Sequence, residues 1–176
     1  ETPKTHGISH LLSSLLTKGT TTRTAREIAE AMEGLSGHVD AYSSRNIFGL
    51  QATFLSEKMT EGLNLFFDCL LHPDFPEKEI FKEKRHTATA IRNEEDSLPQ
   101  LAIRKFLETL YQKHPYALSS LGTLSSIKKI TRTQLQKFYR SMIHPKNLVI
   151  SIVGDVNAQE IKKRFVEKFE ALGPGY

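Results

Sequence analysis

Hydrophobic residues recur at helical spacing along most of this chain. In the first such stretch, residues 7–17, the apolar residues share one helix face, and Gly19 after it is a typical residue at a helix end. Thr24 and Glu27 then have the spacing of a capping box, which predicts the start of a second helix. The apolar residues of the first stretch are Ile8, Leu11, Leu12, Leu15 and Leu16.

The pattern changes to that of β-strands in the next part of the chain. Residues 38–44 and 46–55 are rich in strand-forming residues, and the short polar segment between them predicts a hairpin-like pair. Further along, residues 148–153 form a mostly apolar run between Asn147 and Gly154, which predicts a buried strand.

Helical spacing returns in five further stretches, and a second capping box formed by Thr131 and Gln134 starts one of them. The predicted helices cover residues 58–71, 77–96, 99–111, 131–142 and 158–171, with a loop at 114–123. The sum is a single α+β domain over residues 1–176, with helices packed on one face of a mostly antiparallel sheet. Because three strands make a small sheet for so many helices, we expect further strands outside this segment and a longer polypeptide with several such units.

Composition and charge narrow the class of protein. Of the 176 residues, 39% are hydrophobic and 25% are charged, which is typical of a globular domain and excludes a disordered, collagen-like or coiled-coil chain. The formal net charge of +4 is too mild to indicate a nucleic-acid partner. No apolar run reaches the ~18 residues of a membrane span. The lone Cys69 excludes an internal disulfide, and its place on an apolar helix face predicts a buried, unreactive thiol.

The first helix carries a pattern with known chemistry. His10-Leu-Leu-Ser13-Ser14, followed by a short apolar stretch and Lys18-Gly-Thr20, resembles the signature of the insulinase/pitrilysin family of zinc metallopeptidases, the inverzincins. That signature is His-x-x-Glu-His. Its two histidines lie one turn apart and bind zinc, and its glutamate acts as general base on the metal-bound water. A carboxylate from a later helix completes the ligands.

This chain keeps the spacing and the flanking residues of the motif, but the base and two of the three zinc ligands are replaced. His10 matches the first histidine, but Ser13 stands at the position of the base and Ser14 at that of the second histidine. On the helix predicted at 77–96, Ala90 stands at the position of the third ligand. A full ligand set contributes about 10–16 kcal/mol in structural zinc sites, so a lone imidazole binds zinc far too weakly to hold it. The resemblance therefore implies no catalytic residue and no zinc in this chain.

The resemblance extends over about residues 3–172, through segments in the same order as in the family. They are residues 34–43, 66–75, 92–99, 110–127 and 145–155. Family members pair two similar α+β units around a peptide-holding chamber. This chain would be a non-catalytic half that walls the chamber and supports a zinc-bearing half, in the same or a second chain, which hydrolyses peptides. The resemblance also implies an extracytoplasmic location such as the bacterial periplasm.

One segment is a candidate contact with peptide. Asp40, Ala41 and Tyr42 resemble the edge strand that, in catalytic members, pairs with an extended substrate. Main-chain pairing of this kind requires no particular side chain, so the loss of zinc ligands would leave it intact. The alternative is that these residues form a plain structural strand.

Other functions stay open at this level. The chain could be a structural or binding module with no link to proteolysis, and a second copy of it is a further candidate partner. His6 and His10 are also four residues apart and could form an unusual metal site, against the simpler view of a terminal histidine and a half-buried one. Ser13 and Ser14 lack the glycine-flanked turn and the neighbouring base of a serine nucleophile.

Overall fold

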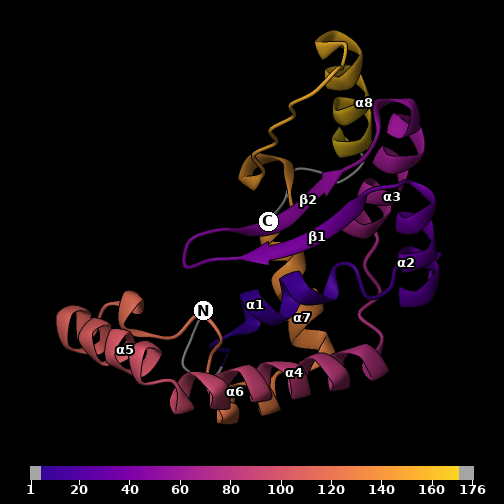
Figure 1. Ribbon diagram of the computed structural model, residues 1–176. Coiled ribbons are helices and arrows are strands. Elements are labelled where there is room, and N and C mark those ends of the chain that lie inside the picture. The colour runs from indigo at the N-terminus through magenta and orange to yellow at the C-terminus, as the bar shows by residue number, and fades with distance from the viewer. Residues whose placement is uncertain (1–4, 171–176) are drawn as a thin grey trace.

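A computed structural model describes residues 5–170 and shows many helices around one two-stranded antiparallel sheet (Figure 1). The elements are α1 (Ile8–Leu15), α2 (Ala25–Gly34), β1 (His38–Ser43), β2 (Phe48–Thr53), α3 (Met59–Leu71), α4 (Glu77–Asp96), α5 (Leu98–Tyr111), α6 (Leu124–Lys129), α7 (Arg132–Met142) and α8 (Ala158–Glu170). Short 3₁₀ turns lie at Ser56–Lys58, Pro115–Ala117 and Pro145–Asn147. The predicted α+β class is confirmed; the last residue of the helix predicted at 158–171 lies outside the described residues.

The hairpin of β1 and β2 has one covered face and one exposed face. Along β1, Val39 is buried while the neighbouring His38 and Asp40 are exposed. β2 alternates in the same way, with Leu50 partly buried and Gln51 exposed. Because successive side chains of a strand point to opposite faces, the helices pack on one face of the sheet, as the sequence predicts.

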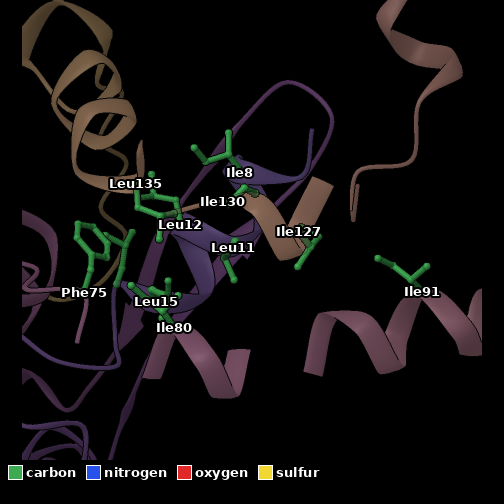
Figure 2. Packing of buried hydrophobic residues seen from close by; sticks show 11 residues of the cluster. Ile8, Leu11, Leu12, Leu15, Phe75, Ile80, Ile91, Ile127, Ile130 and Leu135 are labelled. Atoms are coloured by element: carbon green, nitrogen blue, oxygen red, sulfur yellow. The ribbon is translucent and has the colours of Figure 1, made fainter. Parts of the chain in front are cut away.

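The main core is built around α1. Its apolar residues Leu11, Leu12 and Leu15, with Leu16 just after the helix, have 0% of their surface exposed. Figure 2 shows the side chains that surround them from other elements. These come from α4, from α6 and the residue after it, from α7 and from the loop before α4: Ile80, Ile91, Ile127, Ile130, Leu135 and Phe75. A helix this short is stable only because its neighbours bury it.

Two further clusters join this core at the sheet. One gathers α3 and α8, where the rings of Phe67 and Phe165 meet edge to face with centroids 4.7 Å apart. The other packs α2 against β1 and α3 and includes Val39 and the fully buried Cys69. Leu50 of β2 packs against all three clusters, so the hairpin connects the helices on its covered face.

Local capping determines where several helices begin. Both predicted capping boxes, at Thr24 and at Thr131, are present. A third box at Thr123 starts α6, which the sequence analysis missed. Its third residue is Ser126 instead of the usual glutamate or glutamine, and α6 has only six residues, so neither the cap nor the apolar period gave a clear signal.

The strand predicted at residues 148–153 is wrong. The segment is not part of a sheet, and Val149 and Val153 are 98% and 95% exposed. Leu148 has extended backbone angles and packs against the cluster of α3 and α8. A strand forms only beside another strand, and among residues 5–170 β1 and β2 pair with each other alone. The apolar pattern therefore indicates a preference for strand, but the described residues provide no neighbouring strand with which this segment could pair.

The contrast between α1 and residues 148–153 can be measured. We expect Leu12→Ala to lower the free energy of unfolding by about 2–5 kcal/mol, because it leaves a cavity in a fully buried site. Val149→Ala serves as the matched control, and we expect a change within about 0.5 kcal/mol because the side chain is exposed. Urea denaturation followed by circular dichroism gives both values. Similar losses for the two variants would contradict this description of the core.

Candidate functional site

The residues at the motif positions lie on two packed helices. His10, Ser13 and Ser14 are on α1, and Ala90 is on α4. Figure 1 shows α1 lying between the hairpin and α4, and the two helices are in contact. Leu11 and Ile91, which follow His10 and Ala90 in the sequence, belong to the same core cluster. The structure thus brings together the two segments that the resemblance assigns to one site.

The side chains at these positions are small and locally satisfied. Ser13 is buried, and its hydroxyl donates a hydrogen bond of 2.9 Å to the backbone carbonyl oxygen of His10. This bond within one helix turn is common for serine, and it uses the one proton of the hydroxyl. Ser14, Ala90 and His10 are each partly buried.

These donors do not fit a zinc ion. The four motif positions offer one imidazole, two hydroxyl groups and a methyl group, whereas zinc in proteins is held by histidine, cysteine or carboxylate side chains. Across residues 5–170, no group of three or more such side chains is placed to hold a metal ion. The chemistry of the donor set therefore disagrees with the metal that the resemblance associates with this motif.

His6 and His10 do not share the regular helical spacing of a two-histidine metal pair. It lies before α1, and Gly7 between them has a positive φ of 88°, so the helical spacing does not extend back to His6. The His6 ring is buried, and its Nε2 lies 2.5 Å from the carbonyl oxygen of Ser119. A carbonyl oxygen only accepts, so Nε2 carries the proton and donates. This geometry argues against the two-histidine alternative.

The start of α1 is held by a close approach of two backbones. A Cβ added to Gly7 would lie 2.5 Å from the carbonyl oxygen of Leu121, and Gly122 also has a positive φ, of 84°. Ser126 of α6 donates a hydrogen bond of 2.7 Å to the carbonyl oxygen of His6. Only glycine permits this approach without strain, so these contacts fix the direction in which α1 enters the core.

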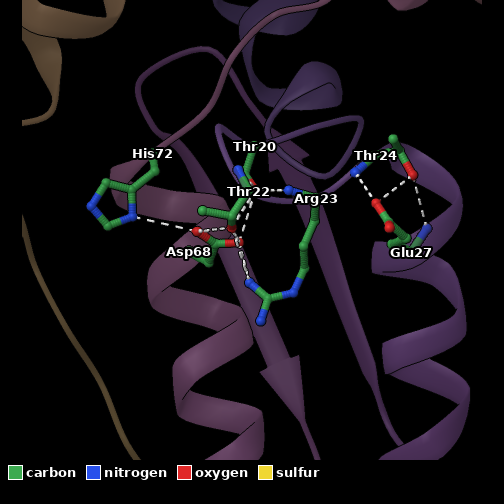
Figure 3. A network of polar contacts seen from close by, with 7 residues as sticks. All are labelled: Thr20, Thr22, Arg23, Thr24, Glu27, Asp68 and His72. Atoms are coloured by element: carbon green, nitrogen blue, oxygen red, sulfur yellow. Dashed lines mark hydrogen bonds and ion pairs between the residues drawn. The ribbon is translucent and has the colours of Figure 1, made fainter.

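The end of α1 is held by a polar network around Asp68 of α3 (Figure 3). Thr20 and Thr22 donate hydrogen bonds of 2.8 Å and 3.1 Å to its carboxylate, and Arg23 forms an ion pair with it. His72 lies 3.4 Å from the other carboxylate oxygen. Sequence reasoning missed this network; its one signal was a charged residue within the apolar run of α3.

The balance of forces on Asp68 favours its charged form. Burial by itself would raise the pKa of this carboxyl. The hydrogen bonds from Thr20, Arg23 and Thr22, together with the charge of Arg23, outweigh burial and hold the pKa below its ordinary value. The next residue, Cys69, shows the opposite case: burial and the nearby carboxylate raise the pKa of its thiol to about 12. The predicted burial of the thiol is confirmed, and a raised pKa disfavours the reactive thiolate.

The candidate peptide-contact residues lie on an edge strand of the two-stranded sheet. Residues 40–42 of β1 pair with residues 49–51 of β2, and no other strand of the described residues pairs with β1. Asp40 and Tyr42 are exposed on the uncovered face, and Ala41 is partly buried on the covered face. The second edge of β1 therefore has main-chain groups that could pair with an added extended segment.

Comparison with known proteins gives matches along the whole chain. Residues 1–124 match the family model described as "Insulinase (Peptidase family M16)", and residues 129–175 match "Peptidase M16 inactive domain". An uncharacterized zinc protease of Rickettsia bellii is 31% identical over 175 residues, 99% of this chain and 42% of that protein. One of Bacillus subtilis is 30% identical over 98% of this chain and 43% of its own length. The chain thus spans less than half the length of these relatives.

Solved structures agree with these matches. The crystal structure of a protease from Helicobacter pylori matches with a TM-score of 0.90 and 26% identity, over 99% of this chain and 42% of that one. A peptidase M16 inactive domain from Pseudomonas fluorescens matches with a TM-score of 0.89 and 25% identity, over 98% and 43% of the two chains. None of the helices within residues 5–170 combines the length and apolar character needed to cross a bilayer.

The Asp68 network predicts a pH-dependent contribution to stability. Because the pKa of Asp68 is lower in the folded than in the unfolded chain, its contribution is fully present above the unfolded-state pKa of about 3.9 and is lost as the pH falls through the folded value. At pH 7 we expect Asp68→Asn to lower the free energy of unfolding by about 1.5–3 kcal/mol, the worth of hydrogen bonds to a charged group.

Urea titrations of wild type and Asp68→Asn from pH 7 to pH 3 measure this effect on the free energy of unfolding. The difference between them should shrink toward the acid end of the series. Asp155→Asn, at an exposed aspartate, is the control and should change little. A difference between wild type and Asp68→Asn that does not vary with pH would contradict the assignment.

Proposed function

The chain belongs to the insulinase (M16) family of peptidases, and we propose that within this family it is a non-catalytic, zinc-ligand-deficient domain. One observation carries the proposal. α1 and α4 are in contact and share one core cluster, while Ser13, Ser14 and Ala90 occupy the positions of the base and of two ligands. The scaffold for the chemistry is present, and the groups that would perform it are not.

The free energy of zinc binding favours an inactive site over a weakened one. Structural zinc sites with full ligand sets contribute about 10–16 kcal/mol, and that energy is shared among several coordinating atoms. With a single imidazole at the motif positions, the rest of the coordination would be water, and no carboxylate base stands beside it. His10 is then simply a partly buried residue of α1 with no metal-binding role.

A domain without the zinc ligands and the base fits the role of supporting a second, catalytic half. We propose that residues 1–176 form one α+β unit of a longer or two-chain peptidase and wall a chamber that holds peptide. A zinc-bearing half in the same or a second chain would hydrolyse the peptide. The span of less than half of the length of the relatives supports this proposal, since it leaves room in such proteins for a second unit of similar size.

The edge of β1 is the segment that we assign to peptide contact. Asp40, Ala41 and Tyr42 lie on a strand with one unpaired edge in the described structure, and an extended peptide could continue the sheet there. The loss of the zinc ligands on α1 does not alter this edge. A peptide held in this way would be positioned by the domain and cleaved elsewhere.

A second candidate function is a structural or binding module unconnected with proteolysis. The same observation, an intact scaffold without ligands, favours it equally. The two functions differ in the partner: a companion with an intact His-x-x-Glu-His motif supports the peptidase role, and its absence from the complex supports the module.

Zinc analysis of the purified chain tests the proposal directly. We expect below roughly a tenth of an equivalent of bound zinc at neutral pH, and only weak uptake on titration, because one histidine cannot replace a ligand set. Elemental analysis and calorimetric titration give these values. Tight binding of one equivalent would overturn the proposal and make the chain a candidate enzyme in its own right.

Restoring the ligands tests the assignment of positions. We expect Ser14→His combined with Ala90→Glu to bind about one equivalent of zinc, since His10 would regain a second imidazole one turn away and a carboxylate from α4. Ser9→His combined with Ala90→Glu is the control. It also adds an imidazole to α1, but directly before His10, where the two side chains point to different faces of the helix. Equal uptake by the two double variants would show that the positions are wrongly matched.

A further inference from the structure

Helix α5 is attached to the domain by few buried contacts. None of its residues is buried, and within residues 5–170 the three core clusters contain no residue from 98–120. A hollow of about 230 Å³ lies between α5, the end of α4 and residues 117–120. Figure 1 shows α5 at the periphery, away from the core around α1. Parts of a fold with few buried apolar contacts are the ones that open most readily.

One polar group on α5 is unfavourably buried. The Nε of Arg104 is shielded from solvent and has no hydrogen-bond partner. The carboxylates of Glu95 and Glu108 lie 3.8 Å and 3.9 Å from the guanidinium, beyond hydrogen-bond distance. A buried donor without an acceptor costs free energy, and this cost disappears when water reaches the donor. The present position of α5 therefore carries a penalty that a more open position would not have.

The segment that contains α5 lies between two joints. Ser97 alone separates α4 from α5, and its backbone is extended. At the other end, the carbonyl oxygen of Ser119 lies 2.5 Å from Nε2 of the buried His6, next to the core. We call residues 98–118, between these joints, the α5 arm. Short segments at the ends of helices are typical hinges, because a few residues there absorb the change in backbone angles.

The tip of the β1–β2 hairpin holds the far end of the arm. Arg45 Nη1 donates hydrogen bonds of 2.6 Å and 3.0 Å to the carbonyl oxygens of Tyr116 and Leu118. The guanidinium of Arg45 also lies over the Tyr116 ring, 5.9 Å from its centroid. The Tyr116 hydroxyl donates a hydrogen bond of 2.8 Å to Oδ1 of Asn46. Two neighbouring residues of the hairpin tip therefore contact the same short turn of the arm.

Tyr116 connects this attachment to α5. Its ring meets those of Tyr111, the last residue of α5, and His114 edge to face, with centroids 5.4 Å and 4.8 Å apart. Gln112, directly after α5, has a positive φ of 48°. A residue other than glycine keeps such a conformation only where the surrounding contacts hold it. The ring contacts thus join α5 and the turn after it into one unit.

We propose that the α5 arm opens from the domain as one unit about the joints at Ser97 and Ser119, and that Arg45 is the latch that keeps it closed. Opening exposes the hollow and lets water reach Arg104 Nε, whereas closing restores the contacts of Arg45. Because the latch lies at the hairpin tip, displacing the tip releases the arm. This device goes beyond the proposed function, since it requires neither zinc nor peptide.

Amide hydrogen exchange of the folded 176-residue chain tests the opening. In wild type we expect the hydrogen-bonded amides of α5, residues 102–111, to be at least about tenfold less protected than those of α1. Their protection factors should be similar along α5, because one opening exposes them together. Protection in α5 equal to that in α1 would overturn the proposal, and so would protection that falls steadily from one end of α5 to the other.

Removal of the latch is the sharper test. We expect Arg45→Met to speed exchange throughout residues 102–111 about tenfold, equal to about 1.4 kcal/mol, and to leave α1 unchanged. Arg26→Met is the matched control, because Arg26 of α2 is an exposed arginine whose ion pair is with Glu30 of its own helix. It should leave α5 at the wild-type rate.

Three results for Arg45→Met would refute the latch. They are unchanged exchange in α5, equal acceleration in α5 and α1, and an acceleration that Arg26→Met reproduces. Tyr116→Phe adds a graded variant, since it keeps the ring contacts and loses only the hydrogen bond to Asn46. We expect it to speed exchange in α5 by a smaller factor, about threefold. A larger effect than that of Arg45→Met would show that Arg45 is not the latch.

Discussion

The burial of α1 is the constraint on which the rest of the structure depends. Leu11, Leu12, Leu15 and Leu16 are fully buried, so α4, α6, α7 and the hairpin must all pack against this one short helix. Its two ends are fixed independently. The Gly7 approach to residues 121–122 holds the start, and the network of Asp68 holds the segment after the end. A helix of eight residues has little stability of its own, and these contacts supply it.

This arrangement explains how a catalytic site can be lost while the fold stays. The packing energy of α1 comes from its leucines, and Ser14 and Ala90 lie at partly buried positions outside that cluster. Ser13 is buried, but its hydroxyl is satisfied by the carbonyl oxygen of His10. Small residues at the ligand positions therefore cost the core little. The apolar positions of α1 and α4 are constrained by packing, whereas the ligand positions would be constrained only by zinc.

Sequence reasoning succeeded where the signals are local. The period of α1, the capping boxes at Thr24 and Thr131 and the alternation in β1 depend on residues close together in the chain. It failed where the outcome depends on distant residues. The apolar run at 148–153 needed a neighbouring strand to become one, and Thr20 meets Asp68 across 48 positions of sequence. The motif predicts a candidate site on α1 and α4, but it gave no sign of the way α1 is held.

The buried polar groups of the domain differ in how far the fold satisfies them. Asp68 has hydrogen bonds from three residues, so the fold itself accounts for its burial. Within residues 5–170, three buried side-chain atoms lack a partner: Thr87 Oγ1, His144 Nδ1 and Arg104 Nε. Of these residues, Arg104 alone lines the hollow between α5 and residues 117–120. A buried donor without an acceptor costs stability, so the fold accounts for the burial of Asp68 but not for that of Arg104 Nε.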